Sequence, residues 1–266
     1  MNSDVVHAVV LAFVQGATEF LPISSSGHLI LLPHLAAWRD QGLGFDIAVH
    51  FGALVAVLAY FRSDITHMSQ ASWTSLTCGV HTEFSRLTWI VLIAVLPVAI
   101  AAYWLREAVS MSLRLPLVIA TATFGFGLVL GWADKYGRRC RGLSELGWRD
   151  GVLIGLMQAL ALIPGTSRSG ITITAGLMLG FTRQAAARFS FLLSIPTIVL
   201  ASGWMVWSWS AAESMQWSGV LVGAGVSAVV AYLCIHLFLR FVEQTSLLPF
   251  VIYRLLLGMW LFYIYW

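Results

Sequence analysis

The chain has 266 residues, of which 59% are hydrophobic and only 10% are charged, with a formal net charge of +3. A soluble domain carries about 25% charged residues, so the composition excludes a water-soluble protein and predicts one embedded in a membrane. The small net charge, with no long basic stripe, argues against a nucleic-acid partner, and the three cysteines lack the paired spacing of a metal site.

The first apolar region, residues 5–38, is interrupted at its centre by the polar sequence QGATEFLPISSSGH at residues 15–28. Each half is shorter than the ~20 residues that cross a bilayer as a helix. Irregular backbone survives at membrane depth only where it is buried in protein or lines a wet cavity. We therefore predict a re-entrant helical hairpin that enters and leaves on the same side.

Three uninterrupted apolar spans follow, and each lies between charged residues: 47–61, 87–105 and 115–133. After a basic loop at 134–150, a second interrupted region at 151–181 carries PGTSRSG at its centre, which predicts a second re-entrant hairpin. Three more spans complete the chain: 189–212, 214–239 and 244–266. The predicted fold is an all-α integral membrane protein with six transmembrane helices and two re-entrant helical hairpins.

The distribution of basic residues predicts the orientation, because cytoplasmic loops are rich in Lys and Arg. With the loop at 134–150 in the cytoplasm, alternation of the spans places eleven of the fifteen basic residues there, Arg254 among them. Three others are outside, Arg168 lies within the membrane, and both termini are extracytoplasmic.

The two interrupted regions resemble each other. Residues 15–27 (QGATEFLPISSSG) echo residues 158–170 (QALALIPGTSRSG), with one residue inserted after the proline. Each is followed by three spans, and the two halves start on opposite sides. This order predicts an inverted-topology repeat within one membrane domain, which places a ligand site near the midplane. Its parts are repeat one at 1–133, the cytoplasmic loop at 134–150 and repeat two at 151–266; two unrelated Ser/Gly/Pro segments are the alternative.

Arg168 is the most informative residue, because a charge at membrane depth costs at least ~2.5 kcal/mol on insertion scales and marks a functional site. Its neighbours free backbone N–H groups or add hydroxyl donors: Gly165, Thr166, Ser167, Ser169 and Gly170. A helix predicted to begin near Ile171 adds its N-terminus, and arginine binds phosphate in a bidentate fork. The pattern predicts an anion site, with a purely structural ion pair to Glu19 as the alternative.

Glu19 is the second charge at membrane depth, and it shares one helix face with Gln15, four residues earlier. In a site of low dielectric constant its carboxylate suits a metal ligand or a general base. His28, at the hairpin tip, suits a nucleophile or a proton donor to a leaving oxygen, and Ser26 is a competing nucleophile. Serines that cap the returning helix are the structural alternative, and both roles can hold together.

Over residues 15–28 (QGATEFLPISSSGH) and 164–173 (PGTSRSGITI) the chain resembles the bacterial undecaprenyl-pyrophosphate phosphatases, also called bacitracin-resistance proteins. Similar segments at 45–57, 188–196 and 249–258 extend the resemblance over almost the whole chain. The family removes the terminal phosphate of undecaprenyl diphosphate and returns the monophosphate carrier to peptidoglycan synthesis. The resemblance implies an inner-membrane enzyme with this substrate and membrane lipid as partners, inhibited indirectly when bacitracin sequesters the substrate. A homodimer is compatible with a protein of this size.

The resemblance also implies roles for individual residues. The catalytic set is Glu19, Ser26, His28 and Arg168, and the substrate- and phosphate-binding set is Gln15, Ser24, Ser25, Gly165, Thr166, Ser167, Ser169 and Thr172. A divalent cation, Mg²⁺ or Ca²⁺, is implied, although many members carry a Glu where this chain has Gln15. With one carboxylate the cation would rely on Glu19, waters and the substrate phosphates. The active site is expected to face the extracytoplasmic side, and a polyprenyl-phosphate flippase on the same inverted repeat is the alternative function.

Overall fold

The computed structural model describes residues 3–36, 38, 42–111, 115–208 and 217–266, and within these ranges the secondary structure is helical apart from one isolated bridge between Arg141 and Phe181. Six described helices are long and apolar enough to cross a membrane. They are α3 (Leu43–Tyr60), α5 (Glu83–Met111), α6 (Pro116–Tyr136), α9 (Arg183–Ser208), α10 (Trp217–Gln244) and α11 (Leu248–Tyr265). The six predicted spans are confirmed, with described ends that differ from the prediction by a few residues; residues 209–212 and 214–216 of two predicted spans lie outside the described residues.

Each interrupted region forms a pair of shorter helices, and the predicted re-entrant path of each pair through the membrane stays a prediction. The first pair is α1 (Ser3–Thr18) and α2 (Ser25–Ala36), and the second is α7 (Trp148–Ala159) and α8 (Arg168–Met178), with the 3₁₀ turn η2 (Leu160–Leu162) after α7. The basic loop contains a second 3₁₀ turn, η1 (Leu143–Glu145). Helix α4 (Arg62–Cys78) was not predicted, because its side chains are largely polar and exposed.

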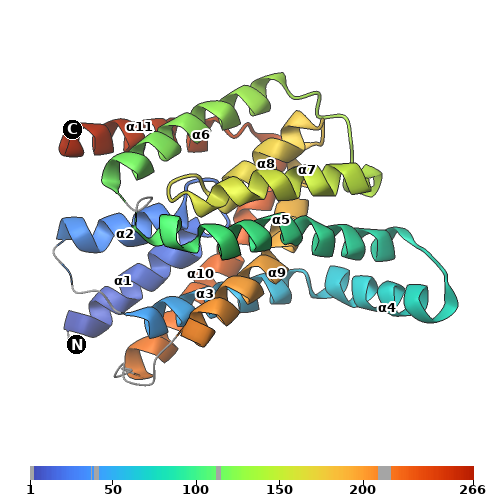
Figure 1. Cartoon of the computed structure of the whole chain (residues 1–266), viewed down its shortest axis with the longest axis horizontal. Coiled ribbons are helices and arrows are strands. Elements are labelled where there is room, and N and C mark those ends of the chain that lie inside the picture. The colour runs from blue at the N-terminus through green and yellow to red at the C-terminus, as the bar shows by residue number, and fades with distance from the viewer. Residues whose placement is uncertain (1–2, 37, 39–41, 112–114, 209–216) are drawn as a thin grey trace.

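Different parts of the chain lie at the two ends of the molecule along its longest axis (Figure 1). Both chain termini lie at one end, whereas α4 and the connection from α6 to α7 lie at the other. The termini therefore share an end opposite the basic loop at 134–150, which is the arrangement expected from the distribution of basic residues.

Helices of the first half pack against helices of the second half, in pairs that occupy equivalent positions in the two halves. Helix α1 packs on α10 and α7 packs on α5, while α3 contacts α9 and α6 contacts α11. Small residues permit the close approach: a Cβ on Gly16 of α1 would lie 2.7 Å from the Ser227 carbonyl oxygen of α10, and one on Gly155 of α7 would lie 2.3 Å from the Ala94 carbonyl oxygen of α5. Such equivalent contacts are what an inverted repeat requires, and the repeat stays a prediction.

Ion pairs join the helix ends beside the basic loop. Arg183 at the start of α9 binds Asp134 at the end of α6 (2.5 Å), and Asp134 also accepts from the Leu247 N–H (3.0 Å). Arg141 in the loop binds Asp150 of α7 (2.6 Å). The loop is thereby tied to α7, and α6 is tied to α9 and to the turn before α11.

Candidate active site

The first hairpin breaks between α1 and α2. Helical hydrogen bonding continues to Glu19, whose N–H donates to the Gln15 carbonyl (2.9 Å). Pro22 has no N–H and disfavours helical backbone in the residue before it, so the chain turns here. Ser24 has a left-handed φ of 74°, and its hydroxyl accepts from the Gly27 N–H (3.4 Å), which caps α2.

The second hairpin repeats this local structure at Ser167. Its φ is 71°, and its hydroxyl accepts from the Gly170 N–H (3.1 Å), so Ser24 and Ser167 cap equivalent helices. Helix α8 begins at Arg168, earlier than the start predicted near Ile171. The N–H groups of Arg168 and Ser169 therefore lie in the first turn of α8, where they have no intrahelical acceptor.

The second hairpin tip is held closely against α6. Gly165 has a φ of 94°, and a Cβ there would lie 2.5 Å from the Ile119 carbonyl oxygen. The hydroxyl of Thr123 donates to the Gly165 carbonyl (3.3 Å). Glycine is required here because both the backbone conformation and the available space exclude a side chain.

The two charges predicted at membrane depth form an ion pair between the hairpins. Arg168 Nη2 donates to Glu19 Oε1 (2.9 Å), and the two side chains are only 13% and 9% exposed, respectively. Glu19 Oε2 accepts from the Ser25 hydroxyl (2.7 Å) and from the Gln15 amide (3.1 Å). Both helices of the first hairpin and the second hairpin thus converge on one carboxylate.

Arg168 is oriented by α9 and still has donors to spare. Its Nη1 donates to the Ser190 carbonyl (3.2 Å), and its guanidinium lies over the Phe20 ring at 5.9 Å from the centroid. The Ser190 hydroxyl is 2.7 Å from that of Thr172, so the predicted residue Thr172 supports the segment that orients Arg168. A guanidinium carries five N–H donors, and hydrogen bonds to Glu19 and Ser190 use two of them among the described residues, which leaves the others for an anion.

A further link between the tips runs through Ser169. Its hydroxyl donates to the Leu21 carbonyl (2.8 Å) and lies 3.2 Å from the Ser167 hydroxyl. Both predicted serines are buried. They therefore also fasten the two broken segments together.

His28 contacts Tyr253 of α11 and the backbone of its own hairpin. Its Nδ1 is 2.7 Å from the Ser24 carbonyl and its Nε2 is 2.5 Å from the Tyr253 hydroxyl. A carbonyl oxygen only accepts, so Nδ1 donates and, in the neutral ring, the Nε2 lone pair accepts from Tyr253. The His28 and Tyr253 rings are stacked at 5.7 Å. Ser26 lies in the first turn of α2, and its side chain falls outside the described part of the structure.

Arg254 was assigned to the cytoplasmic side, and this assignment is wrong. Arg254 lies on α11, and its side chain is fully buried in the protein. The guanidinium donates to five backbone carbonyls, two from α6 and three from the hairpin tips. The acceptors are Ala122 (3.4 Å), Thr123 (3.1 Å), Pro22 (3.2 Å), Gly165 (3.0 Å) and Thr166 (2.8 Å). Arg254 therefore bridges both hairpins, and a charge near the middle of the last span was the signal that pointed to it.

Two predicted binding residues keep buried polar atoms without a partner in the described structure. Gln15 Oε1 and Thr166 Oγ1 have no hydrogen-bond partner, and both side chains are fully buried. The Gln15 amide nitrogen donates to Glu19, so the unpartnered Oε1 of the same amide lies near the Glu19 carboxylate. This oxygen could accept from a ligand hydroxyl or bind a cation there. Among the described residues no group of three or more His, Cys, Asp or Glu side chains could hold a metal ion.

Comparison with known proteins identifies the family. The family model described as "Bacitracin resistance protein BacA" matches residues 8–260, and the chain belongs to this family. The chain is 54% identical over 263 residues to an undecaprenyl-diphosphatase of Nitrosococcus oceani, covering 98% of this chain and 99% of the relative. It is 52% identical to undecaprenyl-diphosphatase 2 of Stutzerimonas stutzeri, with 96% of each chain covered. It is also 50% identical to an undecaprenyl-diphosphatase of Thioalkalivibrio sulfidiphilus, with 99% of this chain and 100% of the relative covered.

Proposed function

We propose that the chain hydrolyses undecaprenyl diphosphate to undecaprenyl phosphate and inorganic phosphate at the junction of the two hairpin tips. The observation that carries the site assignment is the Glu19–Arg168 pair (2.9 Å), which lies at the N-terminus of α8. Relatives that are about half identical over nearly their whole length are named for this reaction, so a flippase without hydrolytic activity is not favoured.

The arrangement suits phosphoryl transfer because it gathers donors around one point. The N–H donors of Arg168 that no described residue uses, with its backbone N–H and that of Ser169, would bind the oxygens of the terminal phosphate and stabilise the charge that develops on them. An oxygen nucleophile bonds to the terminal phosphorus, the anhydride P–O bond breaks, and the lipid monophosphate leaves with the bridging oxygen.

The two candidate nucleophiles are Ser26, which the family resemblance implies, and a water activated by Glu19. Ser26 follows Ser25, whose hydroxyl contacts Glu19 at 2.7 Å, so it belongs to the same turn of α2. His28 lies further along that helix, with its Nε2 at the Tyr253 hydroxyl. To act in the reaction, Nε2 would exchange Tyr253 for the substrate, take a proton as a general base, and return it as Nε2–H to a leaving oxygen. Its neutral tautomer is supported by the Ser24 carbonyl.

A divalent cation fits the oxygen ligands beside the ion pair. The carboxylate of Glu19 and the unpartnered Oε1 of Gln15 would hold it, and oxygen ligands suit Mg²⁺ or Ca²⁺. The cation would supply positive charge against the phosphates. Because Gln15 is neutral, cation affinity should depend strongly on the phosphates of the substrate.

The proposal includes the cellular setting. We place the protein in the bacterial inner membrane, with the loop at 134–150 in the cytoplasm and the active site open toward the extracytoplasmic side. The polyprenyl tail then stays in the bilayer while the diphosphate reaches the hairpin tips. Bacitracin would act indirectly, by sequestering the substrate, and a homodimer is compatible with this arrangement.

The test is phosphate release from undecaprenyl diphosphate by purified protein in detergent, with and without EDTA. Arg168→Gln and Glu19→Gln should abolish release, whereas Arg240→Gln, which removes an exposed charge of α10, should leave it intact. Lipid binding is measured in parallel. Well-folded protein that binds the diphosphate and never releases phosphate would refute the hydrolase and support lipid transport.

A further inference from the structure

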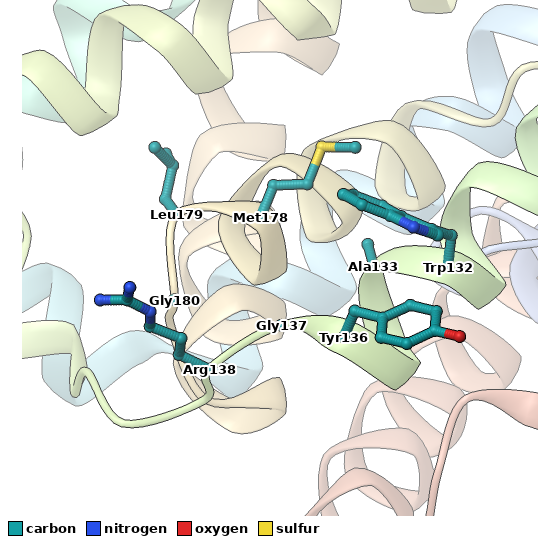
Figure 2. Close-up of a pocket in the computed structure, with 8 residues that line it drawn as sticks. All are labelled: Trp132, Ala133, Tyr136, Gly137, Arg138, Met178, Leu179 and Gly180. Atoms are coloured by element: carbon teal, nitrogen blue, oxygen red, sulfur yellow. The ribbon is translucent and has the colours of Figure 1, made fainter.

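A second concave site lies at the far end of α6, away from the hairpin tips. It has a volume of about 380 Å³, within the ~300–1,000 Å³ of small-ligand sites. Figure 2 shows Trp132 and Tyr136 on one side of it and Arg138 on the other, with Met178 between them. Gly180, which follows α8, also lines the cavity.

The charges around this cavity are not balanced by acids. Lys135, Arg138 and Arg139 are exposed, and none of them pairs with a carboxylate in the described part of the chain. Lys135 instead lies over the Tyr136 ring, at 5.4 Å from its centroid, and Arg139 donates to the Gly137 carbonyl (3.3 Å).

The described carboxylates of this loop and its flanking helix ends already have partners, and one of them, Glu145, accepts from the Gly142 N–H (2.6 Å). Asp134 is bound to Arg183, and Asp150 is bound to Arg141. The cavity therefore carries a local excess of positive charge that an anion can offset.

Hydrogen bonds join the two segments that line the cavity, the chain after α6 and the chain after α8. The N–H groups of Cys140 and Arg141 both donate to the Gly180 carbonyl, each at 3.0 Å. Thr182 N–H donates to the Arg141 carbonyl (2.9 Å), and the Arg141 guanidinium donates to the Leu179 carbonyl (3.0 Å). The turn after α6 and the end of α8 thus form one braced unit, and the site is largely preformed, as ligand sites usually are.

The position of the cavity indicates the kind of anion. It lies at the end of a membrane-spanning helix, and Trp132 and Tyr136 are 55% and 64% exposed, as expected for aromatic residues at the bilayer interface. Met178 adds an exposed apolar surface. A free phosphate would use only the cationic side, whereas a lipid headgroup would place its phosphate near Arg138 and its glycerol and first acyl carbons against the aromatic and apolar side.

We propose that this cavity, formed by Trp132, Tyr136, Arg138, Met178 and Gly180, binds the phosphate headgroup of an acidic phospholipid. The site is separate from the hairpin tips, and the proposal does not depend on the phosphatase assignment. Acidic lipids attract basic residues at the membrane surface by about 1 kcal/mol per Lys or Arg, which corresponds to about a five-fold change in affinity.

The test is lipid binding by the purified protein, measured by native mass spectrometry as detergent micelles are supplemented with dioleoyl phosphatidylglycerol. Arg138→Gln should weaken binding by about five-fold, and Lys135→Gln should weaken it in the same direction. Arg149→Gln is the matched control, because Arg149 is an exposed cation at the start of α7 that does not line the cavity. Phosphate release should stay unchanged in all three variants.

Three results would overturn the proposal. Equal weakening by Arg149→Gln and Arg138→Gln would show general attraction to the basic loop instead of a site. Equal binding of dioleoyl phosphatidylcholine would remove the preference for an acidic headgroup. Competition by inorganic phosphate that displaces phosphatidylglycerol completely at comparable concentrations would assign the cavity to a free anion.

Discussion

Replacing Arg254 with methionine is expected to destabilise the junction of the two hairpins. The substitution keeps an apolar stem but removes donors to five buried carbonyls. Each buried acceptor left unsatisfied costs about 1–3 kcal/mol. The carbonyls of α6 keep their helical partners, and the Gly165 carbonyl keeps the Thr123 hydroxyl. Counting only the Pro22 and Thr166 carbonyls at the lower bound gives about 2 kcal/mol.

The assay is thermal unfolding in detergent, followed by phosphate release from protein that remains folded. Arg254→Met should lower the unfolding midpoint and reduce kcat even at temperatures where the variant is folded, because both hairpin tips lose a common anchor. Arg240→Met removes an exposed charge from α10 and should change neither quantity. If Arg254→Met unfolds at the wild-type midpoint and retains wild-type kcat, the anchoring argument is refuted.

Three further predictions concern the site and the loop. Arg168→Gln should lower kcat by about 100-fold or more, as for loss of a donor to developing charge, with an unchanged circular dichroism spectrum; a change in KM alone would contradict this. Tyr253→Phe should lower kcat by about five-fold and alter its pH profile, because His28 Nε2 loses one hydrogen bond; an unchanged profile would leave Tyr253 a packing residue. Burial alone would raise the pKa of Asp150, but hydrogen bonds from Arg141 and the Gly147 N–H lower it overall. The ionised carboxylate therefore stabilises the fold near neutral pH, and this contribution is lost as the pH falls through the lowered pKa. The unfolding midpoint should therefore drop less in Asp150→Asn than in wild type between about pH 6 and about pH 3, and an equal drop would exclude this pair as the cause.

The spans and their interruptions could be predicted because the relevant forces are local. An apolar run of sufficient length becomes a membrane helix, and a run broken by proline, glycine and serine does not. The contact between Glu19 and Arg168 was predictable because a charge at membrane depth needs a partner. Glu19 was the acidic residue predicted at the same depth as Arg168.

Arg254 and Tyr253 could not be placed in this way. The partners of Arg254 are backbone carbonyls, which every residue has, so no side-chain pattern identifies them. Alternation of the spans assigned it to the cytoplasmic charges, whereas tertiary packing placed it against the hairpin tips. Tyr253 contacts His28 only because α11 lies beside α2, and sequence separation hides that proximity.

The charges at the centre of the protein explain why the site suits an anion. Glu19 and Arg168 offset each other, but Arg254 is compensated only by carbonyl dipoles in the described structure, and the N-terminus of α8 adds a partial positive charge. The balance at the hairpin tips is therefore positive, in a place where burial makes uncompensated charge costly. A phosphate bound by the remaining donors of Arg168 would reduce that imbalance without breaking the ion pair, since within the described structure Glu19 and Ser190 occupy two of its five donors. In the proposed site, the same pairing that fastens the two halves of the chain would also hold the guanidinium in position for the phosphate.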